Sequence, residues 1–105
     1  MHSMKELADI KRVEMVDYEP TKDHALFSFI GEKGTPMSLW VHRSTFISMM
    51  GKWDKEKLGE MSIQQTTLRT NLLATYKMPL QEWPVWFETM TNDILKRKAN
   101  TRRPY

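Results

Sequence analysis

The chain has 105 residues, a formal net charge of +3 and no cysteine. One domain is expected, because a second hydrophobic core would have too little surface to bury. The absence of cysteine excludes disulfides and thiolate metal ligands and favours a reducing compartment. No apolar run approaches the roughly 20 residues that span a bilayer, and the first residues lack the apolar segment of a signal peptide. We therefore expect no membrane partner and a cytoplasmic location, in the host cytoplasm if the source is viral.

The basic charge is concentrated near the C-terminus. Residues 1–92 carry eleven Lys and Arg against twelve Asp and Glu, whereas residues 93–105 carry five against one. The isoelectric point of about 9.3 therefore reflects the C-terminal end, and the remainder is close to neutral. We predict one compact domain over residues 1–98 and a basic tail over residues 99–105, with Asn100 as the helix stop.

The first part of the chain predicts a short helix and then three strands. Residues 3–11 contain a capping serine, a glutamate three residues later and apolar residues at i, i+3, which favours a helix. The alternating segments VEMVDY, HALFSFI and MSLWVHR are separated by turn residues. They predict a three-stranded antiparallel meander over about residues 12–43.

The second turn indicates the register of its hairpin. Residues 32–34 fit a three-residue loop with Gly34 in the left-handed conformation. This register places Phe27 opposite Leu39 on a wholly apolar face, whereas a shift by one residue would mix apolar and polar side chains. The second face then carries three facing pairs: Leu26 with Trp40, Ser28 with Ser38, and His24 with His42.

Three or four helices are expected after the strands, packed on one face of the sheet. Ser44 or Thr45 is the expected N-cap of the first helix. Ser62 is expected to cap a later helix that buries Ile63, and Pro84 fits the first turn of the last helix. The predicted fold class is therefore α+β.

The sequence contains no catalytic or metal-binding signature. Its serines and threonines lack a nearby His–Asp pattern, its carboxylates are scattered singly, and GEKG is a hairpin turn rather than a phosphate loop. His24 and His42 could begin a metal site, but their neighbours offer no third ligand of a suitable type. We expect no enzyme activity, no cofactor and no bound metal.

Two features favour nucleic-acid binding. Cations near the C-terminus could hold phosphates, although the helix dipole partly explains those at the end of the last helix. The second sheet face could stack single-stranded bases, with Val16 and Tyr18 beside Trp40; the alternative is that Trp40 belongs to an ordinary core. The candidate nucleic-acid-binding residues are Lys96, Arg97, Lys98, Arg102, Arg103, Tyr105, Trp40, His42 and Arg43.

Residues 54–73 also allow a helix–turn–helix. Its second helix would present polar side chains to base edges: Gln64, Gln65, Thr67, Arg69 and Asn71.

The sequence allows a second class of function, in which the partner is a protein. Nine methionines suit an adaptable apolar surface, as in a small adaptor or inhibitor, for example a phage-encoded protein that acts on a host protein. Pairing of exposed strand edges could also form a homodimer. The sequence therefore predicts a small non-enzymatic nucleic-acid-binding or regulatory protein, with a protein-binding adaptor as the alternative.

Overall fold

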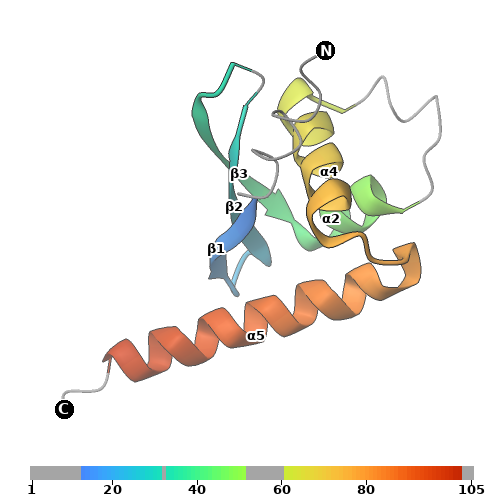
Figure 1. Cartoon of the computed structure of the whole chain (residues 1–105). Coiled ribbons are helices and arrows are strands. Elements are labelled where there is room, and N and C mark those ends of the chain that lie inside the picture. Colours follow the sequence, from blue (N-terminus) through green and yellow to red (C-terminus); the bar gives the residue numbers. More distant parts are fainter. Residues whose placement is uncertain (1–12, 32, 52–60, 103–105) are drawn as a thin grey trace.

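The computed structural model describes residues 13–31, 33–51 and 61–102 (Figure 1). Its elements confirm the α+β class, with strands first and helices after them. The predicted N-terminal helix lies outside the described residues. In chain order the elements are β1 (Glu14–Glu19), β2 (His24–Ile30), β3 (Pro36–His42), α2 (Arg43–Met50), α4 (Ile63–Tyr76), the short 3-10 helix η2 (Leu80–Glu82) and α5 (Trp83–Arg102).

The sheet is an antiparallel meander in the order β1–β2–β3. The pairs between β2 and β3 run from His24 opposite His42 to Ile30 opposite Pro36, which confirms the predicted register. Gly34 has a φ of 77° and so takes the left-handed conformation that the three-residue loop requires.

A β-bulge at Val16 decides which side chains of β1 face the core. Met15 and Asp17 each pair with a residue of β2, and Val16 between them is the extra residue. Beyond the bulge Tyr18 lies on the buried face, with 6% of its surface exposed. The prediction that placed Tyr18 beside Trp40 was therefore wrong, because the bulge shifts the alternation by one residue.

Helices α2, α4 and α5 pack on one face of the sheet, as predicted (Figure 1). Phe46 of α2 is completely buried at the centre of an aromatic cluster. Its ring centroid lies 5.7 Å from Phe27 in β2, 5.8 Å from Trp86 and 4.7 Å from Phe87 in α5. Aromatic packing thus joins the sheet to the first and last of these helices.

Side-chain caps set the starts of α2 and α4. The Ser62 hydroxyl accepts a hydrogen bond from the Gln65 amide, and the Gln65 side chain accepts one from the Ser62 amide, each at 3.1 Å. This capping box confirms Ser62 as the N-cap. The cap of α2 is His42 rather than Ser44 or Thr45, because His42 Nδ1 accepts the Ser44 amide at 3.1 Å.

Candidate functional site

The second face of the sheet is free of helices among the described elements (Figure 1). Trp40 on this face is 47% exposed, and the bulged Val16 of β1 is 45% exposed. The prediction of an exposed aromatic on the second face is therefore confirmed for Trp40. We call this surface the open face; it is formed by Glu14, Asp17, Glu19, His24, Leu26, Ser28, Ile30, Pro36, Ser38, Trp40 and His42.

A hollow of about 500 Å³ lies on the open face beside Trp40, and carboxylates form part of its wall. The hydrogen bond from Lys98 lowers the pKa of Asp17, and hydrogen bonds from Thr21 lower that of Glu19. Both groups are therefore anionic at neutral pH. Cations lie there as well, since Lys98 pairs with Asp17 and Lys22 also lines the hollow, so the hollow carries charges of both signs. Its lining residues are Asp17, Glu19, Lys22, His24 and Trp40.

His24 and His42 lie opposite each other, as predicted, with ring centroids 5.4 Å apart and planes at 85°. The Nδ1 atom of His42 accepts from the Ser44 amide and lies 2.9 Å from the Ser44 hydroxyl, so it is engaged at the start of α2. Within the described ranges, no group of three His, Cys, Asp or Glu side chains is placed to hold a metal ion.

Arg43 lies on the helix side of the sheet and not with Trp40. Its Nε donates to both carboxylate oxygens of Asp23, at 3.1 and 2.9 Å, and its guanidinium lies 5.0 Å from the Phe87 ring centroid. The Tyr18 hydroxyl donates to the same carboxylate at 2.6 Å. Burial raises the pKa of Asp23, but the hydrogen bonds from Tyr18 and Arg43 outweigh it, so the pKa is lowered overall. Arg43 thus belongs to a polar cluster on the face of the sheet that packs against the helices.

Helix α5 continues through Asn100 to Arg102, so the predicted helix stop was wrong. Residues 99–102 of the expected tail are therefore helical. A 20-residue helix accommodates asparagine near its end because the propensity cost of one such residue is small. Arg103 and Tyr105 lie outside the described residues, and so does the side chain of Arg102.

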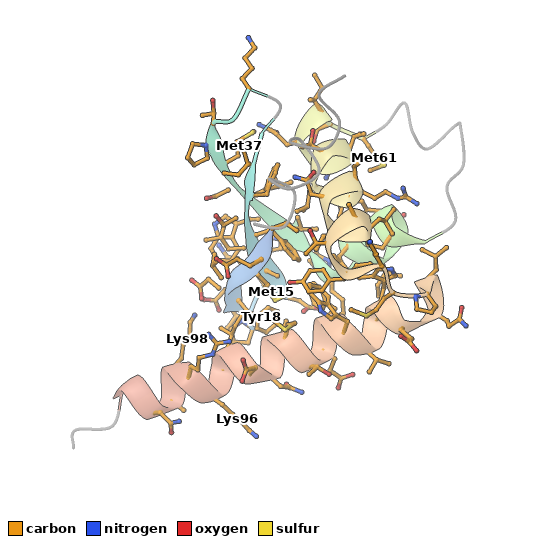
Figure 2. The ribbon with its side chains drawn as sticks, viewed as in Figure 1. Met15, Tyr18, Met37, Met61, Lys96 and Lys98 are labelled. Atoms are coloured by element: carbon orange, nitrogen blue, oxygen red, sulfur yellow. The ribbon has the colours of Figure 1, made fainter. Side chains whose placement is uncertain are left out.

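The three cations at residues 96–98 point in different directions. Lys98 turns back to the sheet, where its ammonium binds the Asp17 carboxylate at 2.5 Å and the Tyr18 carbonyl at 3.1 Å. Arg97 pairs with Asp93 one turn earlier in α5. Lys96 points away from the sheet (Figure 2). The structure therefore does not gather these three cations into one surface.

Three of the five side chains that the helix–turn–helix hypothesis assigned to base contacts are engaged within the fold. Arg69 donates from Nε to the Met49 carbonyl at 2.6 Å. Asn71 is buried, and its amide lies 3.4 Å from the Ile30 carbonyl. Gln65 is used in the capping box of α4. These polar groups hold the fold together and are not presented to a ligand.

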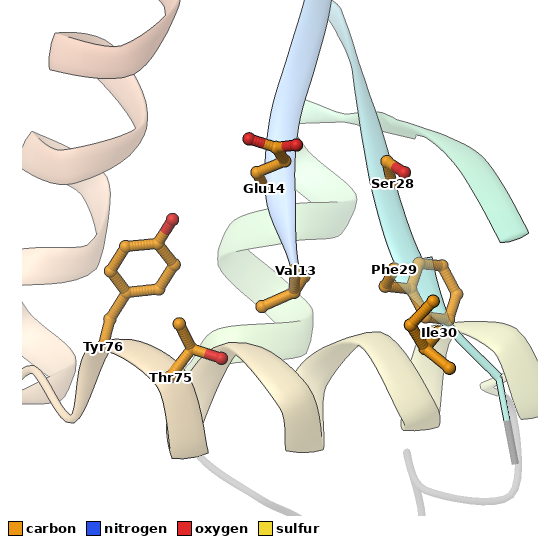
Figure 3. A pocket seen from close by; sticks show the side chains of 7 residues that line it. All are labelled: Val13, Glu14, Ser28, Phe29, Ile30, Thr75 and Tyr76. Carbon is orange, nitrogen blue, oxygen red and sulfur yellow. The ribbon is translucent and has the colours of Figure 1, made fainter. Parts of the chain in front are cut away.

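A second hollow, of about 510 Å³, lies between the sheet and the end of α4 (Figure 3). Burial raises the pKa of Tyr76, and the nearby charge of Glu14 raises it further. The hollow contains one carboxylate and several hydroxyl groups. This set does not form the hydrogen-bonded pair of nucleophile and base that nucleophilic catalysis requires. Its lining residues are Val13, Glu14, Ser28, Phe29, Ile30, Thr75 and Tyr76.

Exposed apolar side chains also occur on the helices, singly and in several places. Ile63 is 75% exposed at the start of α4, so the prediction that it would be buried was wrong. Val85 is 65% exposed at the start of α5, and Ile47 is 42% exposed in α2. Scattered exposure of this kind is normal on a protein surface. The sheet face around Trp40, which no described helix covers, is the more extended feature.

The carboxylates beside Trp40 are the part of the site that the sequence reasoning missed. Asp17 and Glu19 were not assigned a role, because their position relative to Trp40 depends on the bulge in β1.

The chain matches no protein-family model, no curated protein and no solved structure. No described helix combines the length and the apolar character that crossing a bilayer requires.

Proposed function

We propose that the protein is a small, non-enzymatic protein-binding module whose open face contacts a partner protein. The observation that carries this proposal is the half-exposed Trp40 on a sheet face that no described helix covers, with the Asp17 and Glu19 carboxylates in the hollow beside it. Tryptophan is enriched among the residues that dominate binding energy at protein interfaces. Asp17 is already paired with Lys98, so Glu19 is the carboxylate that favours a partner with an apolar surface and a cationic side chain at its rim.

Charge distinguishes this proposal from nucleic-acid binding through the same face. Arg43 lies on the helix side of the sheet, and Lys98 is paired with Asp17. The exposed positions of Lys96 and Arg97 on α5 support a second candidate function, which is weak, sequence-independent contact with phosphates.

Two matched variants test the role of the open face. Trp40→Ser removes the exposed ring, and Ile63→Ser removes a more exposed apolar side chain at the start of α4. The full-length chain and both variants would be immobilised and exposed to a nuclease-treated extract of the cells that normally contain the protein. A protein retained by the wild type would then be purified and titrated directly. We expect Trp40→Ser to weaken its binding by about thirtyfold, with Ile63→Ser unchanged.

Equal affinity of the wild type and Trp40→Ser for that partner would contradict the proposal. The second candidate has its own measurement, which is anisotropy titration of labelled oligonucleotides at about 50 and about 200 mM salt. Binding that falls at least about tenfold over this range and is lost in Lys96→Gln would favour phosphate contact by α5. Partner binding through an apolar centre would change little over the same range.

A further inference from the structure

We propose that the protein forms a twofold dimer in which β3 of one copy pairs antiparallel with β3 of a second copy. The three strands of each copy would then form one continuous six-stranded sheet. This inference concerns the edge of the sheet and does not rest on the function proposed for its open face. The partner strand is inferred to be β3 of a second copy because the outward groups of β3 are complementary to one another about a twofold axis.

The two edges of the sheet differ in how they are protected. Helix α5 packs beside β1 (Figure 1), where Lys98 binds the Tyr18 carbonyl and the Asp17 carboxylate. A charged side chain and a bulge are both common means of blocking an edge strand. The β3 edge has neither, because residues 37–42 contain no charged side chain and pair in regular register with β2, and Pro36, which lacks an amide N–H, stands only at the start of the strand. Among the described elements, β2 is the only strand beside β3.

Hydrogen bonds at both ends of the hairpin show which amides of β3 face outward. The Gly31 amide donates to the Thr35 carbonyl at 2.8 Å, and the Arg43 amide donates to the Asp23 carbonyl at 3.0 Å. Both bonds join odd-numbered residues, and hydrogen-bonded pairs alternate with non-bonded pairs along an antiparallel ladder. The amides at positions 37, 39 and 41 therefore face β2. Those of Ser38 and Trp40 face away from it.

The outward groups of β3 are self-complementary about Leu39. With Leu39 opposite Leu39 of the second copy, Ser38 faces Trp40 and Trp40 faces Ser38. Each of these two pairs can exchange N–H···O bonds in both directions, because both residues have outward amides and carbonyls. The same register faces Met37 with Val41 on the core side. Apolar side chains therefore face apolar side chains across the junction. A twofold dimer uses the same surface on both copies, so the β3 edge can supply the interface by itself.

Pairing would also cover apolar surface that β3 leaves partly open. Met37 and Leu39 are only partly buried against the core, whereas Phe27 and Phe29 of β2 are almost completely buried. Trp40 is 47% exposed on the open face. In the Leu39-centred register the two Trp40 side chains are diagonal neighbours, at a spacing of about 7–8 Å between backbones, within reach of aromatic rings.

A matched pair of substitutions tests the dimer. Ser38→Lys and Ser28→Lys introduce the same charge at facing positions of the open face, one on the edge strand and one on the central strand. Sedimentation equilibrium on the full-length chain from about 1 to about 300 μM gives the dimer dissociation constant of each. We expect Ser38→Lys to raise it at least about tenfold, because two lysines per dimer must lose water at the new junction. Ser28→Lys should change it less than about threefold.

Amide hydrogen exchange on the wild type gives a second readout that needs no variant. At about 300 μM the amides of Ser38 and Trp40 should exchange at least about tenfold more slowly than at about 1 μM. Those at positions 37, 39 and 41 should be protected at both concentrations, since they bond to β2. A monomer throughout the range overturns the proposal. So does a dimer in which the Ser38 and Trp40 amides stay unprotected, or one that Ser28→Lys weakens as much as Ser38→Lys.

Discussion

Replacing Arg43 with methionine tests whether this residue holds the fold together or serves a binding surface. Methionine keeps the aliphatic length of the side chain but removes the charge and the hydrogen bonds to Asp23. A hydrogen bond to a charged group contributes about 1.5–3 kcal/mol when buried, and the contact with the Phe87 ring about 0.5–1 kcal/mol. The Arg43 and Asp23 side chains are 34% and 32% exposed, so solvent screening reduces the first figure. We expect Arg43→Met to lower the free energy of unfolding by about 2 kcal/mol.

The measurement is urea unfolding followed by circular dichroism and tryptophan fluorescence at pH 7. Arg97→Met is the matched control, because Arg97 also pairs with a carboxylate but its side chain is 67% exposed. It should cost less than about 0.5 kcal/mol. Because the fold lowers the pKa of Asp23, the stabilisation from its charged form is present above the ordinary value of 3.8 and is lost as the pH falls through the lowered value. The cost of Arg43→Met should therefore shrink in acid. A cost equal to that of Arg97→Met would refute the reasoning.

Three further substitutions test other parts of the structure by the same unfolding assay. Phe46→Ala should cost about 3–5 kcal/mol, because it empties the centre of the aromatic cluster; a cost near 1 kcal/mol would show that the cluster is loosely packed. His42→Ala should cost about 1 kcal/mol through loss of the α2 cap, and His42→Asn should restore most of it, since asparagine is a good N-cap. Gly34→Ala should cost about 1 kcal/mol from the left-handed backbone alone, since nothing lies within 4 Å of the added methyl group; no loss would mean that the loop adopts another conformation.

The hairpin of β2 and β3 could be predicted from the sequence because local chemistry and burial agree there. Gly34 supplies the conformation that a three-residue loop requires, and a shifted register would place Phe27 opposite Ser38 in place of the apolar Leu39. The capping box at Ser62 was predictable for a similar reason, since all of its atoms lie within four residues. Each of these features is decided by residues close together in the chain.

The residues whose positions were predicted wrongly from the sequence owe those positions to a strand irregularity or to a contact with a residue far away in the chain. The apolar residues of β1 change phase between Met15 and Val16, which is the signal of the bulge, but a regular strand was assumed and Tyr18 was assigned to the wrong face. Lys98 and Arg43 resemble surface cations in the sequence. Their roles follow from partners 81 and 20 positions away, Asp17 and Asp23, which no local pattern indicates.

The size of the open face links the proposed function to the proposed dimer. Strands of six or seven residues rise by about 3.3 Å per residue and lie about 4.8 Å apart, so three strands present a projected area of roughly 300 Å². Two open faces joined across β3 would double this projected area to roughly 600 Å² on one continuous sheet. The shared surface would have a Trp40 from each copy near its centre and the carboxylates of the two β1 strands at its outer margins. Partner binding and dimerisation should then support each other, and Ser38→Lys should weaken partner binding more than Ser28→Lys, which adds the same charge to the open face away from the β3 edge.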